Sequence, residues 1–190
     1  MREIRRKIGH IFLGSLVAAG IFWGKIDAFF LFGISFFLLG FFFIVQKERE
    51  KHFFWKEFLD FFERKTNFPG ASVVFFFVGC ALTAAFFSQK EAAAAILILS
   101  FGDSISHLWG RKFGKRTTFL HPEKKIEGTI AGILAGGAAA SAIFPIFPAF
   151  LAAAIAMILE IPKIKIGKKT IDDNLIVPIV AGFFLHFFSF

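Results

Sequence analysis

Cysteine, tyrosine and catalytic side-chain groupings are scarce in this sequence. Cys80 is the single cysteine, and there is no tyrosine beside 32 phenylalanines. One cysteine cannot form a disulfide or a cysteine-based metal centre within one chain. No Ser/His/Asp set or Cys/His pair is identifiable, so nucleophilic hydrolysis has little support. The histidines His10, His52, His121 and His186 have no metal-ligand spacing, and we expect them at interfaces or in loops.

Charged residues are also few, at 19% of the 190 residues, whereas hydrophobic residues make up 56%. Apolar runs of this length cannot all be covered by so few polar residues in a soluble fold. The composition therefore predicts an all-α integral membrane protein. Residues 1–190 are expected to form a single membrane domain, because the chain leaves no room for a separate soluble domain.

The basic residues are confined to short patches that alternate with apolar stretches. All but two of the 22 Lys and Arg residues lie in residues 1–8, 46–67, 110–126 and 161–173. Basic residues are retained in cytoplasmic loops, and this rule accounts for the net charge of +8 without a nucleic-acid partner. It also predicts a cytoplasmic N-terminus and places all four patches on the cytoplasmic side.

A helix needs about 20 apolar residues to cross the hydrocarbon region, with a range of about 17–25. The stretch 127–160 is too long for one crossing, and Pro145 and Pro148 divide it because proline interrupts helical hydrogen bonding. We therefore predict about seven transmembrane helices, near residues 8–24, 27–45, 70–88, 91–110, 127–143, 147–160 and 174–190. Within residues 46–67, phenylalanines recur at helical spacing among Lys and Glu. This pattern predicts an amphipathic interfacial helix, either a simple connector or the border of a lipid entry.

Asp103 is the first polar residue that the apolar pattern does not explain. It lies about seven residues before Gly110, or about 10 Å inside the predicted helix end at 1.5 Å per residue. An acid at that depth needs a polar cavity or a partner. Helical spacing places Asp103, Ser106, His107 and Gly110 on one face. Two readings are open: a polar contact between helices, or a metal- or phosphate-handling site.

Basic residues follow directly. The segment from Gly110 to Arg116 resembles a P-loop, but three residues and not four separate its glycines, and Arg116 replaces the Ser or Thr that binds magnesium in that motif. Glycines beside Arg111, Lys112 and Lys115 suit a flexible loop that closes on phosphates. Lys124 and Lys125 then precede a helix N-terminus, which favours anions.

Glu127 stands at that helix start, where it either stabilises the first turn or binds a metal. Gly128, Gly132 and Gly136 recur every four residues and predict close helix packing. The last polar cluster consists of Glu160, at the end of the sixth predicted helix, and of Asp172, Asp173 and Asn174, which open the final helix. Such a run can be helix capping, but three polar residues before an apolar helix favour function.

Together these residues predict a transferase site at the cytoplasmic face. Carboxylates and phosphate oxygens are the usual ligands of Mg²⁺, and Asp103, Glu127, Asp172 and Asp173 are the candidate ligands. The candidates for nucleotide and phosphate binding are Arg111, Lys112, Lys115, Lys124, Lys125 and Asn174. Phosphoryl or nucleotidyl transfer requires mainly positioning and charge neutralisation. The apolar helices would supply a lipid acceptor from the bilayer.

At these positions the sequence resembles the dolichol kinase/phytol kinase family of CTP-dependent polyprenol kinases. The resemblance covers roughly residues 98–185. It rests on Gly102-Asp103-Ser104 with Gly110 to Lys115, on Lys124 to Gly128, and on Asp172 to Leu175 with Pro178. It implies transfer of the γ-phosphoryl group of CTP to an isoprenoid alcohol. His107, Trp109 and Ile126 depart from the residues expected there. The phosphatidate cytidylyltransferases are distantly similar, but their C-terminal signature is replaced here by the Asp-Asp-Asn run.

The expected function is thus a Mg²⁺-dependent kinase of the cell membrane, with CTP, a lipid alcohol and membrane lipids as partners and with catalytic residues Asp103, Glu127 and Asp173. Asp173 is the candidate that orients or deprotonates the acceptor hydroxyl. The alternatives are a cytidylyltransferase that makes a CDP-lipid and a diacylglycerol kinase of the same family. A transporter that uses the membrane acids as an ion path is a third class. Self-association into a homo-oligomer is left open.

Overall fold

The computed structural model describes residues 2–48, 70–118, 120–162, 165–166 and 169–189. Seven α-helices make up most of this part of the chain, and two short antiparallel hairpins connect some of them. The helices are α1 (Arg2–Phe22), α2 (Ala28–Glu48), α4 (Ala71–Phe86), α5 (Gln89–Phe113), α6 (Ile126–Ala140), α7 (Ile146–Leu159) and α8 (Asp173–His186). The strands are β1 (Thr117–Thr118), β2 (His121–Lys125), β3 (Lys165–Ile166) and β4 (Lys169–Thr170). The all-α prediction is therefore confirmed.

Each predicted apolar stretch coincides with one of these helices, and most boundaries agree within a few residues. The largest difference is at α1, which begins at Arg2 and not near residue 8. Helix α5 continues to Phe113, so the predicted loop from Gly110 is wrong at its start. Gly110 stays helical and packs against α6. The connection after α5 is a hairpin in which Thr117 pairs with Lys125. The amphipathic helix predicted within 46–67 lies almost entirely outside the described residues.

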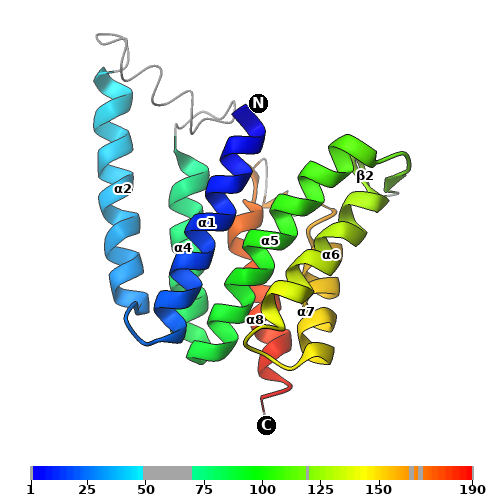
Figure 1. Cartoon of the computed structure of the whole chain (residues 1–190). Helices are drawn as coiled ribbons and strands as arrows, with labels where there is room; N and C mark the ends of the chain where they lie inside the picture. The colour runs from blue at the N-terminus through cyan, green and yellow to red at the C-terminus, as the bar shows by residue number, and fades with distance from the viewer. Residues whose placement is uncertain (1, 49–69, 119, 163–164, 167–168, 190) are drawn as a thin grey trace.

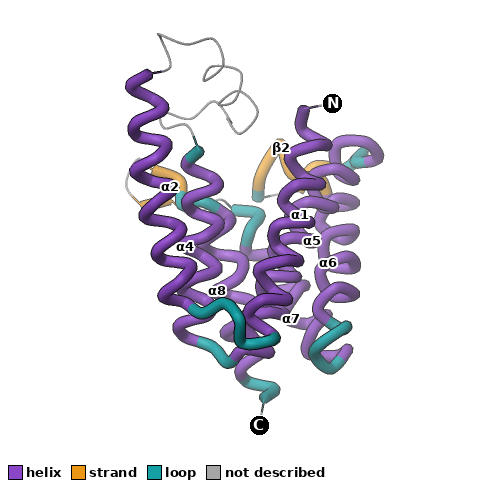
Figure 2. The backbone as a smooth tube through the Cα atoms, turned by 60° about the vertical axis from the view of Figure 1, so that its left-hand side comes forward, coloured by secondary structure: helices purple, strands orange, loops and turns teal. Residues whose placement is uncertain are grey.

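The helices run up and down the bundle (Figure 1). The N-terminal end of α1 and the hairpin between α5 and α6 lie at one end, and the C-terminus lies at the other. Figure 2 shows the hairpin strands at the first end as well. We call the end that carries the start of α1 and the α5–α6 hairpin the charged end, because the described parts of the four basic patches belong to the chain segments that meet there. The connections 23–27, 87–88 and 141–145 lie at the opposite end.

Helix α5 occupies the middle of the bundle, where it packs against α1, α6 and α8. Its first turn is fixed by a capping box, in which Ser88 accepts from the amide of Glu91 and the Glu91 carboxylate accepts from the amide of Ser88. This arrangement satisfies amides that the helix itself leaves unpaired. The small side chains of Ala92–Ala95 follow and are fully buried. Small residues bring neighbouring helices close to α5 along this length.

The glycine stripe of α6 faces α5, as the four-residue spacing predicts. A Cβ atom on Gly128 would lie 2.5 Å from the carbonyl oxygen of Ser106, and one on Gly132 would lie 2.8 Å from that of Gly102. Backbone atoms cannot move away as flexible side chains can, so any larger residue would separate the helices. The two backbones therefore touch, and this contact fixes the position of the polar residues on α5.

Two described helices are long and apolar enough to cross a membrane by length and composition, namely α5 and the part of α2 over Ala28–Lys47. Helices α4, α6, α7 and α8 are apolar but shorter. The outer surface of α2 is strongly apolar, with Phe29 87% and Phe36 80% exposed. Seven membrane crossings remain a prediction that these lengths do not establish.

Candidate functional site

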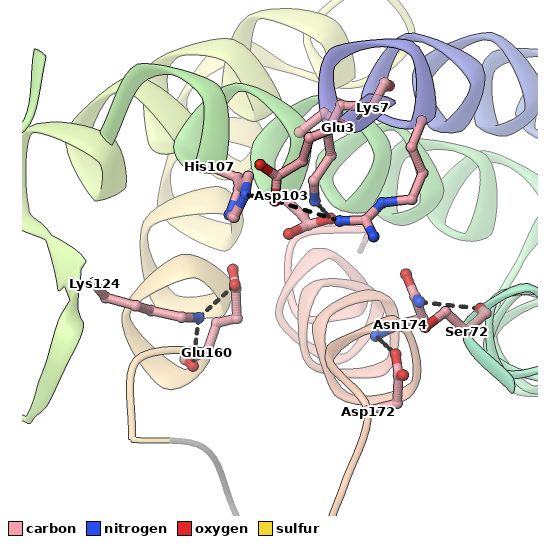
Figure 3. Close-up of polar contacts among 11 residues, drawn as sticks. Glu3, Lys7, Ser72, Asp103, His107, Lys124, Glu160, Asp172 and Asn174 are labelled. Atoms are coloured by element: carbon pink, nitrogen blue, oxygen red, sulfur yellow. Dashed lines mark hydrogen bonds and ion pairs between the residues drawn. The ribbon is translucent and has the colours of Figure 1, made fainter. Parts of the chain in front are cut away.

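Charged side chains from separate segments of the chain gather at the charged end of the bundle (Figure 3). They come from α1, from α5, from β2, from the end of α7 and from the start of α8. The close-up shows Asp103 and His107 on one side, Lys124 with Glu160 on another, and Asp172 with Asn174 on a third. The charged residues of this group are half-buried or buried, which is costly unless each charge has a partner.

Helices α1 and α5 are joined by a polar ladder of two rungs. The Nζ atom of Lys7 lies 2.6 Å from Oδ2 of Asp103, and Nε2 of His107 lies 2.8 Å from Oε1 of Glu3. The two residues on each helix are four positions apart and therefore share a face. Arg111, one further turn along α5, also pairs with Glu3. Asp103 thus has the partner that its depth requires.

Lys7 is the most deeply buried cation in this ladder, with 5% of its surface exposed. Its backbone also participates, since the Ser104 hydroxyl donates to the Lys7 carbonyl at 3.4 Å. A buried ammonium group contributes net stability only when its partner is well placed. In the sequence, Lys7 is one of the basic residues that predict a cytoplasmic N-terminus, whereas in the structure its ammonium group contacts Asp103 directly.

A second buried ion pair joins the α5–α6 hairpin to the end of α7. Nζ of Lys124 donates to Oε1 of Glu160 at 2.5 Å and to the Glu160 carbonyl at 2.8 Å. Glu160 is 6% exposed and directly follows the last residue of α7. Burial raises the pKa of the Glu160 carboxyl, the charges of Asp103 and Asp173 raise it too, and Lys124 opposes them. The Glu160 carboxyl therefore lies within electrostatic reach of carboxylates on α5 and α8.

The Asp-Asp-Asn run divides into separate roles at the start of α8. Asp172 is the N-cap, and its carboxylate accepts from the Asn174 amide at 3.0 Å. The side-chain amide of Asn174 donates to the Ser72 carbonyl at 3.2 Å and ties α8 to the start of α4. Asp172 thus caps α8, and Asn174 tethers α8 to α4. Asp173, in the first turn, contributes to the electrostatic field at Glu160.

Glu127 belongs to a different part of the charged end. Its two carboxylate oxygens accept from the backbone amide of Arg116 at 3.2 and 3.3 Å, so it holds the hairpin against the first turn of α6. Its neighbour Gly128 packs at the level of Ser106 and Gly110. Asp103 lies three residues before Ser106 and seven residues before Gly110, which is about one to two turns closer to the start of α5. Glu127 and Asp103 are therefore not brought together by the packing of α5 against α6.

Within the described residues, no group of three or more His, Cys, Asp or Glu side chains could hold a metal ion. The predicted ligands Asp103, Glu127 and Asp172 instead make the separate contacts given above. Mg²⁺ usually takes only one or two carboxylates together with phosphate oxygens and waters. Asp103 and Asp173 carry oxygen donors of the kind that Mg²⁺ prefers.

The other predicted phosphate-binding residues lie around the hairpin. Lys112 is exposed, with Nζ 5.1 Å from the ring centroid of Phe113. Lys115 is exposed beyond the end of α5. Lys125 is the N-cap residue of α6 and packs its side chain near Gly110 and Gly114. Only Lys124 among the predicted lysines reaches the buried carboxylates.

His10 is not a loop residue. It lies inside α1, one turn beyond Lys7, with its ring 4.9 Å from that of Phe76 in an edge-to-face arrangement. Its Nε2 atom is buried and has no hydrogen-bond partner among the described residues. His10 is therefore part of the packing between α1 and α4 below the polar ladder.

Sequence reasoning missed Glu3 and Lys7 as partners of the site, and it counted Glu160 in the last polar cluster without giving it a role. A signal was present, because Glu3 and Lys7 are four residues apart on one helix, as are Asp103 and His107. No family model, curated protein or solved structure matches the chain. The resemblance to polyprenol kinases therefore rests on the motifs of the sequence alone.

Proposed function

We propose that this protein is an integral membrane kinase that transfers the γ-phosphoryl group of CTP to a lipid alcohol of isoprenoid type at the cytoplasmic face. The observation that carries the proposal is the meeting of two buried ion pairs, Lys7–Asp103 and Lys124–Glu160, at one end of an apolar bundle. The four residues come from distant parts of the chain. Their common position gives one region with both the cations and the carboxylates that phosphoryl transfer needs.

The membrane part of the proposal is supported by the apolar surface. Exposed Phe29 and Phe36 on α2 and exposed Phe12 on α1 would face water in a soluble protein. Large exposed apolar patches mark membrane or protein contacts. In this proposal the seven helices cross or enter the bilayer, and the basic segments of the charged end lie on the cytoplasmic side.

The phosphate-binding part is supported by the way the charges are paired. Lys7 and Lys124 are held by carboxylates and would exchange these partners for phosphate oxygens when a nucleotide binds. The carboxylates released in this exchange, with Asp173, would face the magnesium ion that accompanies the nucleotide. That ion would neutralise charge on the phosphates. Arg111, Lys112, Lys115 and Lys125 surround the entrance from the hairpin side.

In the proposed reaction the lipid hydroxyl oxygen forms a bond to the γ-phosphorus, and the bond between that phosphorus and the β–γ bridging oxygen breaks. CDP leaves with the bridging oxygen. The hydroxyl proton passes to a carboxylate, for which Asp173 is the candidate because it opens α8 beside this region. Glu127 and Asp172 remain candidate metal ligands, but their contacts support roles in holding the hairpin and in capping α8.

The test uses purified full-length protein in liposomes that contain geranylgeraniol. Two parallel reactions carry CTP labelled in the γ-phosphate or in the α-phosphate. The proposal predicts that only the γ-label enters the lipid, that CDP accumulates, and that a magnesium chelator abolishes the transfer. Entry of the α-label with release of pyrophosphate would assign the protein to the cytidylyltransferases. Transfer to diacylglycerol in preference to geranylgeraniol would assign it to the diacylglycerol kinases.

A further inference from the structure

An apolar groove of about 470 Å³ runs beside α8 and is distinct from the charged side chains described above. It is lined by Phe86, Phe87, Leu159, Ile179, Val180, Phe183 and Phe184. These residues come from the end of α4, the end of α7 and one side of α8. Phe183 is 51% and Leu159 is 41% exposed, so the groove is open along its side. A hydrocarbon chain can therefore enter it laterally.

One end of the groove lies next to the charged site. Leu159 directly precedes Glu160, which forms the buried ion pair with Lys124 at the charged end. Asp173 in turn opens the helix that carries Ile179 and Phe183. The groove and the site are thus continuous through α7 and through α8. No described charged residue lines the groove itself.

The other end lies toward the opposite side of the bundle. A Cβ atom on Gly182 would lie 2.5 Å from the ring of Phe87, so the far part of α8 packs against the end of α4. At 1.5 Å per residue, the ten steps along α8 from Asp173 to Phe183 span about 15 Å. The groove therefore extends along α8 toward the opposite end of the bundle, where α4 ends at Phe86.

We propose that this groove holds the hydrocarbon chain of the lipid alcohol, with its hydroxyl group beside Glu160 and Asp173. The inference rests on the proposed kinase function and names the part of the protein that selects the acceptor. The first part of the chain, over about 15 Å, lies against α8, and any longer chain continues into the bilayer. Acceptor preference should therefore rise with chain length and then become constant.

The groove selects by shape rather than by removing the chain from water. A chain that comes from the bilayer is already in an apolar medium, so packing contacts supply the preference. Filling the groove with a larger side chain should then exclude long chains by steric overlap. A short acceptor that stays near Leu159 should be affected much less.

The first test compares Ile179→Trp with the matched variant Ile44→Trp, which places the same residue on the exposed face of α2 (Ile44 is 64% exposed). We expect Ile179→Trp to raise KM for geranylgeraniol about tenfold, with a smaller change for geraniol and little change in kcat. Ile44→Trp should behave as the wild type. If Ile179→Trp had the same KM as the wild type for geranylgeraniol and also for geraniol, the groove assignment would be overturned, while the proposed kinase function would stand.

The second test needs no catalysis and uses the wild-type protein. A photoreactive geranylgeraniol analogue in phosphatidylcholine liposomes should label the peptides that contain Leu159 and Phe183. Excess geranylgeraniol should abolish the labelling, whereas excess phosphatidylcholine should not. Labelling that both lipids compete equally would show ordinary bilayer lipid in the groove and overturn the inference. Specific labelling without phosphoryl transfer would retain the groove and reject the proposed kinase.

Discussion

Nζ of Lys7 lies 2.6 Å from Oδ2 of Asp103, although the two residues are 96 positions apart in the chain. The contact joins the first helix to the central helix within the charged end of the bundle. Both side chains are largely buried, at 7% and 18% exposure. Asp103 stands out in the sequence because it interrupts an apolar stretch. Its partner Lys7 does not stand out, because a basic residue near the N-terminus is also explained by membrane orientation.

Removing only the cation of this pair should be more damaging than removing both charges. Lys7→Met leaves the Asp103 carboxylate without its buried partner, and we expect a loss of about 3 kcal/mol in the free energy of unfolding. Lys7→Met combined with Asp103→Leu should recover most of that loss, because no uncompensated charge is left. Thermal unfolding in detergent measures the stability of the single and the double variant. Additive losses in the double variant would mean that the two residues do not interact.

The Glu160 carboxyl should make stability depend on pH. Burial raises its pKa above the ordinary value of 4.5, so the folded state favours the protonated form. The resulting stabilisation is complete below about pH 4.5 and is lost as pH rises toward about 7. The stability advantage of the wild type over Glu160→Gln should therefore decrease over this interval, by roughly 1–3 kcal/mol. An advantage that grows with pH would show that Lys124 dominates and lowers the pKa.

The start of α8 offers a test of capping against metal binding. Asp172→Ala should lower stability by about 1 kcal/mol, whereas Asp172→Asn should keep it, because asparagine is an equally good N-cap. If Asp172 only caps the helix, Asp172→Asn also keeps phosphoryl transfer. Loss of activity in a stable Asp172→Asn protein would instead support the metal-ligand role that the sequence predicts. Asp173→Asn should reduce kcat in either case.

The contact between α5 and α6 should not tolerate a side chain at its closest point. Gly128→Ala places a Cβ atom 2.5 Å from a backbone oxygen of Ser106, and overpacking of this kind costs about 1–3 kcal/mol. Gly40→Ala on α2 is the matched control, since nothing lies within 4 Å of a Cβ there. It should be neutral or slightly stabilising. Equal melting temperatures for the two variants would contradict the close packing of these helices.

The positions of the helices were predictable because long apolar stretches, interrupted by charge clusters and prolines, have few other solutions. The stripe of Gly128, Gly132 and Gly136 likewise predicted a close helix contact. The end of α5 was not predictable in this way. Gly110 reads as a loop residue in the sequence, but packing against α6 needs a residue without a side chain, and this keeps the helix intact.

The candidate site was predictable only in part. Asp103, Lys124 and Asp173 stand out as charges beside apolar helices, and the structure brings the regions that carry them to one end of the bundle. The roles of Asp172, Asn174 and Glu127 were harder to predict, because capping, tethering and metal binding use the same residue types. The spacing of Glu3 and Lys7 predicts that the two share a helix face, but the partner of Lys7 is fixed by the packing of α1 on α5.

The central claim, that the charged end is a phosphoryl-transfer site and not only a structural ion-pair cluster, is tested most directly by the Lys7→Met/Asp103→Leu double variant. Its γ-phosphoryl transfer from CTP to geranylgeraniol is measured in liposomes beside the wild type, with melting temperatures matched. We expect a folded protein whose kcat/KM is at least about 100-fold lower, a loss of roughly 2.7 kcal/mol in transition-state stabilisation. Transfer at the wild-type rate by the stable double variant would contradict the proposed site.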